Sequence, residues 1–165
     1  MDKEIYERQL LSEGEIAPDL TCLDSKGNSF QLSDFHGKKK VIVYFYPKDF
    51  TPGCTAEAME FIEDYNKLQD LNIEIIGVSP DSEESHIKFR KKLHIPYLLS
   101  ADPDNVIAKR YGVYGTKSFM GKEYMGVNRS TFLVDINGKI IKIFRKVRPP
   151  GHSQEVIDFF RRQQT

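Results

Sequence analysis

The chain alternates between short apolar runs and longer amphipathic segments, a pattern typical of an α/β protein. Residues 41–46 and 73–79 are apolar without alternation and rich in β-branched side chains, as expected for central strands buried on both faces. Between them, apolar residues recur at helical spacing from about Cys54 to Leu71, namely Met59, Ile62, Tyr65 and Leu68. We therefore predict a strand–helix–strand unit whose helix packs on the sheet.

Turn and cap signals place the next elements. Residues 18–32 alternate around a Gly-containing turn at 25–28, which predicts an N-terminal hairpin. Asp81 and Glu84 resemble a capping pair that opens a helix ending near Leu93. We expect a short strand at 97–100 and a short helix at 103–111, which begins with a proline.

The C-terminal part predicts a second hairpin and a last helix. Residues 131–135 and 139–147 flank an Asn-Gly turn, and the helix over 153–162 carries an apolar stripe made of Val156, Ile157, Phe159 and Phe160. Together the elements predict an α/β sandwich with a mixed central sheet flanked by helices. We expect one domain over 15–165, preceded by an extension over 1–14 that forms a short helix or a frayed segment.

Charge and length narrow the function classes. The 165 residues include 24 basic and 24 acidic side chains, so nothing in the net charge favours nucleic acid or an anionic membrane as a partner. No apolar stretch approaches the roughly 20 residues that span a bilayer. The first 15 residues lack the apolar core of a secretory signal, so we expect a cytoplasmic protein.

Cysteine and histidine usage argue against a disulfide scaffold or a metal centre. Cys22 and Cys54 are too few for either a disulfide framework or a cysteine-based zinc site. The four histidines show no paired ligand spacing (His36, His86, His94 and His152). We therefore expect neither a metal nor another cofactor.

Cys54 is the candidate nucleophile. It follows the buried strand 41–46 and opens the predicted helix, at the sheet edge where α/β proteins place their sites. Free backbone N–H groups and the positive end of the helix dipole both favour a thiolate there. A cysteine that only fills space under the turn is the alternative, but it needs neither Pro52-Gly53 before it nor the hydroxyl of Thr51.

The segment PKDFTPGCTAE at residues 47–57 resembles the active-site signature of peroxiredoxins, Pro-x-x-x-Thr-x-x-Cys. The full string is similar to the Q-type subfamily, also called bacterioferritin comigratory protein. Residues 119–122 and 128–135 resemble later segments of the same subfamily, so the resemblance covers nearly the whole chain from about residue 15. It implies a thioredoxin-like fold and a thiol peroxidase.

The resemblance also implies residue roles. Cys54 is the peroxidatic cysteine, Pro47 shields it from water, Thr51 hydrogen-bonds the peroxide, and Arg129 supports both thiolate and substrate. Glu57 has a secondary role, orienting Arg129. Independently of the family, attack on an O–O bond needs fixed donors at the oxygens that gain charge. We expect these donors to be the Thr51 hydroxyl, the Arg129 guanidinium and backbone N–H groups near Gly53 and Cys54. Taken alone, Arg129 would be a surface cation and Thr51 a helix N-cap.

One position departs from the subfamily pattern. Many Q-type members carry a resolving cysteine five residues after the peroxidatic one, where this chain has Met59. Three routes remain for the Cys54 sulfenic acid: an external thiol, Cys22, or a disulfide between two subunits. We favour an external thiol from thioredoxin, glutaredoxin or a small molecule. Cys22 is at least as well explained as a buried packing residue.

Two other functions are alternatives to a peroxidase that acts on hydrogen peroxide and organic hydroperoxides. A dithiol oxidoreductase needs Cys-x-x-Cys, and the window here reads Thr51-Pro52-Gly53-Cys54. A thioredoxin-fold binding or holdase module that keeps the motif without turnover stays open. We expect a monomer, with a dimer as the alternative.

Overall fold

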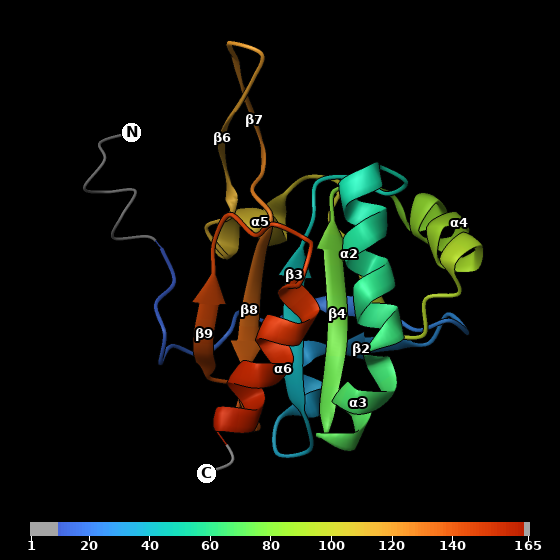
Figure 1. Ribbon diagram of the computed structural model, residues 1–165, viewed down its shortest axis with the longest axis vertical. Coiled ribbons are helices and arrows are strands. Elements are labelled where there is room, and N and C mark those ends of the chain that lie inside the picture. Colours follow the sequence, from blue (N-terminus) through green and yellow to red (C-terminus); the bar gives the residue numbers. More distant parts are fainter. Residues whose placement is uncertain (1–9, 164–165) are drawn as a thin grey trace.

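The computed structural model describes residues 10–163. Within that range, seven strands form one sheet in the order β2-β1-β5-β4-β3-β8-β9, and β6 and β7 form a separate hairpin (Figure 1). The strands are β1 (Thr21–Leu23), β2 (Ser29–Gln31), β3 (Lys40–Phe45), β4 (Ile73–Ser79), β5 (Leu98–Ala101), β6 (Tyr114–Phe119), β7 (Lys122–Val127), β8 (Ser130–Val134) and β9 (Ile140–Phe144). The helices are the 3₁₀ helix η1 (Leu32–Phe35) and the α-helices α2 (Pro52–Glu63), α3 (Tyr65–Asp70), α4 (Glu83–Leu93), α5 (Val106–Arg110) and α6 (His152–Arg162).

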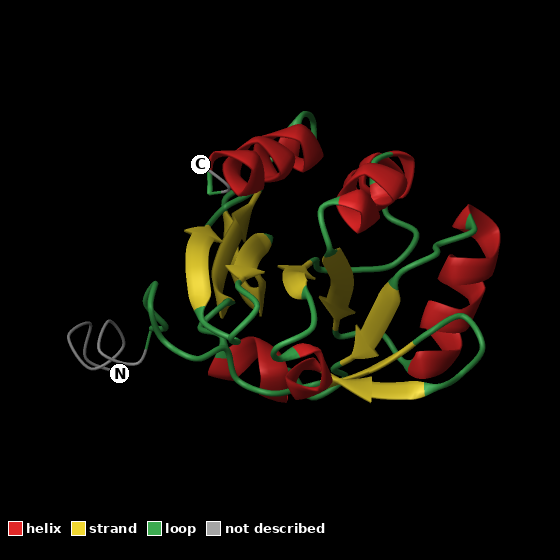
Figure 2. Ribbon diagram, turned by 90° about the horizontal axis from the view of Figure 1, so that it is seen from below, coloured by secondary structure: helices red, strands yellow, loops and turns green. Residues whose placement is uncertain are grey.

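The sheet is mixed, as predicted. Strand β3 pairs parallel with β4 and antiparallel with β8, and β4 pairs parallel with β5. Helices cover both faces of the sheet (Figure 2). Every β3 residue after Lys40 is buried because the strand is covered on both sides.

The core is divided by the sheet into two clusters. Val41, Val43 and Phe45 pack on the face that includes η1 and α5. Ile42 and Tyr44 alternate with them and pack on the face that includes α2, α4 and α6. No helix within residues 10–163 has the length and hydropathy needed to cross a membrane.

The predicted helix from Cys54 to Leu71 is two helices. At Asp64 the backbone leaves helical geometry, with φ −92° and ψ 2°, and the Asp64 carboxylate accepts a hydrogen bond of 2.8 Å from Ser153 of α6. The predicted apolar stripe was wrong at Met59, which is 56 % exposed. The buried positions of α2 are instead Cys54, Glu57, Ala58 and Phe61.

The cap of α4 also differs from the prediction. Ser82, not Asp81, is the N-cap, and its hydroxyl oxygen accepts from the Ser85 N–H at 3.1 Å. Asp81 is held by other donors, because its carboxylate accepts from the Ser79 hydroxyl at 2.6 Å and from the Asp49 N–H at 2.8 Å. Phe159 of the C-terminal stripe is only half-buried.

The hydrophobic pattern did not predict the hairpin β6–β7, which extends away from the body of the protein (Figure 1). Its side chains are mostly exposed, so they leave no period-2 signal of burial. The turn passes through Met120 and Gly121, both at positive φ. Of the predicted extension 1–14, residues 1–9 lie outside the described residues, and residues 10–14 form no helix.

Candidate active site

Cys54 lies in the first turn of α2, directly after the loop that leaves β3. Thr51 is the N-cap residue, and Pro52 begins the helix, where its missing N–H is no loss. The first-turn N–H groups have no helical acceptor, as predicted for a thiolate site. Cys54 is 1 % exposed and belongs to the buried cluster beneath α2.

Arg129 joins this helix from the segment between β7 and β8. Its Nη2 lies 3.3 Å from Sγ of Cys54, and its Nη1 donates to Oε1 of Glu57 at 2.6 Å. Burial acts to lower the pKa of Arg129, but the charges of Glu57 and Cys54 outweigh it and raise the pKa. The guanidinium is therefore a fixed positive charge in contact with the sulfur.

Glu57 lies one helical turn after Cys54, on the same face of α2. Burial raises its pKa to about 7, although the charge of Arg129 acts to lower it. Only one carboxylate oxygen meets Arg129, and Oε2 has no hydrogen-bond partner among the described residues. The predicted orienting contact with Arg129 is present, and Glu57 can gain a proton near neutral pH.

Gly53 makes room for this contact. A Cβ atom added at Gly53 would lie 3.2 Å from Nη2 of Arg129. That distance is shorter than an ordinary van der Waals contact, so a side chain here would push against the guanidinium that touches Cys54. This steric role was not predicted from the sequence.

Thr51 does not use its side chain as a helix cap. Its hydroxyl donates to the Lys48 carbonyl at 2.8 Å, and no N–H of α2 bonds to its oxygen. Because a hydroxyl has only one hydrogen, Thr51 as placed here does not also donate to a peroxide, which differs from the expected donor role. Its oxygen keeps acceptor lone pairs for a donor such as the O–H of a peroxide. Pro47 is half-buried just after β3, and its shielding role stays a prediction.

Cys22 lies on the opposite face of the sheet from Cys54. The two residues belong to the two separate core clusters, and β5 and β4 lie between β1 and β3. Strands β1 and β3 are three strand spacings apart, about 14 Å, and Cys54 lies in α2 on the other face of the sheet, whereas a disulfide allows roughly 7 Å between Cα atoms. Burial, followed by nearby acidic groups, raises the pKa of Cys22 to about 12. Its thiol faces the Phe30 carbonyl at 3.5 Å, which fits a packing residue.

Lys117 of β6 was not predicted from the sequence as a residue of the site. Its Nζ donates to the Val127 carbonyl at 2.8 Å. Burial and the positive charge of Arg129 lower the pKa of Lys117, and Cys54 acts in the opposite sense. Lys117 is thus a second cation within electrostatic reach of the site. The unpredicted hairpin carries it, so no local pattern pointed to it.

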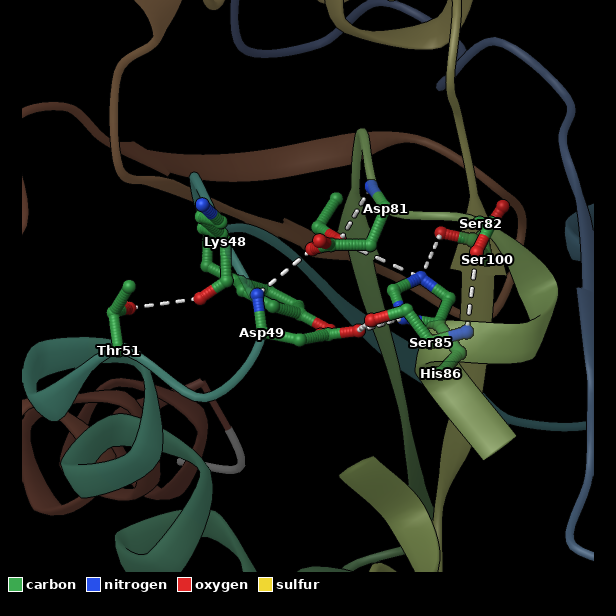
Figure 3. Close-up of polar contacts among 10 residues, drawn as sticks. Lys48, Asp49, Thr51, Asp81, Ser82, Ser85, His86 and Ser100 are labelled. Carbon is green, nitrogen blue, oxygen red and sulfur yellow. Dashed lines mark hydrogen bonds and ion pairs between the residues drawn. The ribbon is translucent and has the colours of Figure 1, made fainter. Parts of the chain in front are cut away.

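A buried polar network behind the loop was also missed (Figure 3). Asp49 is 3 % exposed, and its carboxylate meets the Tyr46 hydroxyl at 2.6 Å, the Ser85 hydroxyl at 2.9 Å and His86 Nδ1 at 2.7 Å. Oxygen or nitrogen atoms of Asp49, Asp81 and His86 all lie within 4.8 Å of one another. Because Asp49 and His86 bond directly to each other, we assign no metal here. The contact between Asp49 and His86 could not be predicted from the sequence, because the two residues lie far apart in the chain.

Comparison with known proteins decides the family. A family model described as AhpC/TSA matches residues 14–143. Peroxiredoxin Bcp from Bacillus subtilis is 46 % identical over 144 residues, which are 87 % of this chain and 91 % of the relative. The chain belongs to the AhpC/TSA family. It is a peroxiredoxin, a thiol-dependent peroxidase with a thioredoxin-like fold.

Solved structures agree with this assignment. A cysteine-to-serine variant of peroxiredoxin Q from Xylella fastidiosa has a TM-score of 0.83 at 30 % identity, and the match covers 94 % of this peroxiredoxin and all of that chain. Bacterioferritin comigratory protein from Xanthomonas campestris has a TM-score of 0.81 at 32 % identity, covering 88 % and 92 % of the two chains. The Xanthomonas campestris structures are of trapped intermediate and ligand complexes and concern alkyl peroxide reduction. The Q-type resemblance seen in the sequence is therefore confirmed.

Proposed function

We propose that Cys54 is the nucleophile of this peroxiredoxin. Its thiolate attacks the peroxide oxygen that carries the hydrogen, and the S–O bond forms as the O–O bond breaks. The other oxygen departs as hydroxide or alkoxide and takes up a proton from solvent, which gives water or an alcohol. Cys54 is left as a sulfenic acid. The observation that carries this proposal is the contact of 3.3 Å between Arg129 Nη2 and the Cys54 sulfur.

Arg129 and Thr51 divide the work of binding the peroxide. Negative charge moves from sulfur to the two oxygens in the transition state. The Arg129 guanidinium is placed to stabilise this charge both on the sulfur and on the oxygens. The Thr51 oxygen accepts a hydrogen bond from the peroxide O–H, since its own hydrogen is directed at the Lys48 carbonyl. Thiolate population cannot replace these contacts, because nucleophilicity falls as the thiol becomes more acidic.

We propose both hydrogen peroxide and organic hydroperoxides as substrates. The reaction involves only the two peroxide oxygens, and the similarity to the Xanthomonas campestris protein, which was studied for alkyl peroxide reduction, supports the organic class. Free reduced cysteines suit the cytoplasm, and the Q-type resemblance supports a monomer.

We propose a one-cysteine cycle. Cys22 is buried on the far side of the sheet, and Met59 occupies the position of the usual resolving cysteine. An external thiol therefore condenses with the sulfenic acid, releasing water and leaving a mixed disulfide. A second thiol then releases Cys54 and forms the external disulfide. Thioredoxin, glutaredoxin or a small thiol fits this role.

Peroxide consumption tests the proposal. Wild-type protein should consume hydroperoxide when dithiothreitol or thioredoxin is supplied, and Cys54→Ser should abolish consumption without changing the circular dichroism spectrum. A binding or holdase module would be indifferent to that substitution. Unchanged peroxide consumption by Cys54→Ser would overturn the assignment of the nucleophile.

A further inference from the structure

The loop that carries Thr51 is fastened to α4 by a buried pair, Asp49 and His86. Asp49 precedes Thr51 by two residues, and both it and His86 are nearly inaccessible, at 3 % and 5 % exposed. Their contact joins Asp49 Oδ2 to His86 Nδ1 at 2.7 Å (Figure 3). The Ser85 hydroxyl of the same helix donates to the same oxygen at 2.9 Å.

Each ring nitrogen of His86 faces an oxygen atom that can accept a hydrogen bond. Nε2 faces the Ser100 carbonyl at 3.1 Å, which can only accept. It also faces the Ser79 oxygen at 3.5 Å, and the Ser79 hydrogen is already directed at Asp81. Nδ1 faces the Asp49 carboxylate, which receives other donors at both of its oxygens. These contacts fit an imidazolium paired with a carboxylate, the form that the proposal below takes and that its last test checks.

The loop needs such a restraint. Phe50 has φ 68°, a left-handed conformation that is costly for a bulky residue, and its ring packs edge-on against Phe89 of α4 at 5.2 Å between centroids. The strained backbone at Phe50 is kept in place by the Asp49–His86 contact before it and by the start of α2 after it.

The Asp49–His86 contact affects the orientation of Thr51 through the carbonyl of Lys48. Lys48 is joined to Asp49 by a peptide bond, and its carbonyl accepts the Thr51 hydroxyl proton at 2.8 Å. Any movement of Asp49 therefore moves the acceptor that orients Thr51. The Asp49 N–H is fixed as well, by Asp81 at 2.8 Å.

We propose that Asp49 and His86 are positioning residues for the peroxide reaction: their buried ion pair holds the 47–51 loop on α4 and so aims the Thr51 hydroxyl oxygen at the substrate. This inference rests on the proposed function of Cys54 and Thr51. Asp49 and His86 would therefore raise the reaction rate without contacting the peroxide themselves.

The first test compares two buried carboxylates. Asp49→Asn and His86→Gln should each slow the single-turnover reaction of Cys54 with hydrogen peroxide by about 10- to 100-fold, the scale of a small misplacement. Asp102→Asn is the matched control, since Asp102 is 5 % exposed and accepts from the Ile107 and Ala108 N–H groups of α5. It should lower the melting temperature but leave this rate within about twofold of wild type. An equal slowing by the control would overturn the proposal.

A double-mutant cycle with Thr51→Val separates positioning from general destabilisation. If Asp49 acts through Thr51, then adding Asp49→Asn to Thr51→Val should lower stability further but not the rate. Fully additive losses of rate would overturn the proposal. Ser85→Ala removes only one donor to Asp49, and it serves in the same cycle should Asp49→Asn fail to fold.

Nuclear magnetic resonance tests the ion pair without any turnover. Both ring N–H protons of His86 should be visible in the wild type, and at least one should be lost in Asp49→Asn. A single ring N–H in the wild type would show that His86 is neutral and would overturn the proposed ion pair. If wild-type Cys54 does not react with peroxide, the proposed function fails, while this spectrum still reports on the pair.

Discussion

Arg129 contacts the sulfur of Cys54 at 3.3 Å, although 75 positions separate the two residues in the chain. One comes from the first turn of a helix and the other from the entry to β8. The Val147 N–H donates to the Arg129 carbonyl at 2.9 Å, which ties this entry to the segment after β9. The reactive atom thus depends on the register of the antiparallel strands as well as on its own helix.

Arg129→Ala should slow the reaction with peroxide by about 100- to 1000-fold, the range seen when one preorganised donor is removed. The guanidinium stabilises charge on oxygen as well as on sulfur, so the rate should fall by more than the thiolate fraction does. Stopped-flow kinetics gives the rate, and ultraviolet absorbance of the thiolate gives the fraction. Equal losses in both would contradict a role in the transition state.

Gly53→Ala should separate stability from activity. An alanine in the first turn favours the helix by up to about 1 kcal/mol, so the protein should be as stable as wild type or more so. The new Cβ would lie 3.2 Å from Nη2 of Arg129 and displace the guanidinium, which should slow the peroxide reaction. Urea unfolding and single-turnover kinetics measure the two effects. Ala56→Gly, at an exposed position of the same helix, is the control: it should lower the stability and leave the rate of the peroxide reaction unchanged.

The strands and the motif were accessible to sequence reasoning because their signals are local. Residues 41–46 are apolar throughout, 73–79 are mostly so, and the string at 47–57 carries its cysteine at a helix start. The Asp49–His86 pair was not accessible, since 37 positions separate its members and only the fold brings them together.

Other misses have equally physical reasons. The hairpin β6–β7 was unpredicted because it buries little and so shows no alternation. The break at Asp64 was unpredicted because it depends on a contact with Ser153, far along the chain. Met59 has the spacing of a core residue, but the helix is rotated so that Ala58 and Phe61 face the sheet instead.

Glu57 should make stability depend on pH. Its pKa is raised from 4.5 to about 7, so the folded state binds more protons than the unfolded state between these values. Stability from this group is therefore complete below pH 4.5 and is lost as the pH rises through about 7, by on the order of 3 kcal/mol. Glu57→Gln removes the titration, so its stability relative to wild type should increase with pH over the same window.

Urea unfolding of both proteins on either side of that window measures the difference. Glu60→Gln is a suitable control, since Glu60 lies on the same helix and is not fully buried. A difference between Glu57→Gln and wild type that does not change with pH would mean that Glu57 is ionised throughout.

Cys22→Ser should leave turnover with a small dithiol within about twofold of wild type, because Cys22 is separated from Cys54 by the sheet. Its pKa of about 12 also keeps it a thiol at neutral pH, which makes it a poor nucleophile toward a sulfenic acid. The serine can keep the contact with the Phe30 carbonyl, so the protein should still fold.

Mass spectrometry of the peroxide-treated protein completes this test. Without reductant, wild type and Cys22→Ser should both carry added oxygen on the peptide that contains Cys54. With a small thiol present, both should carry a mixed disulfide on that peptide, and Cys54→Ser should carry neither. A Cys22–Cys54 disulfide in wild type, together with a strong loss of turnover in Cys22→Ser, would make Cys22 the resolving residue. Because the two thiols face opposite sides of a seven-stranded sheet, that result would also require the β1–β2 hairpin or the start of α2 to unfold during each cycle.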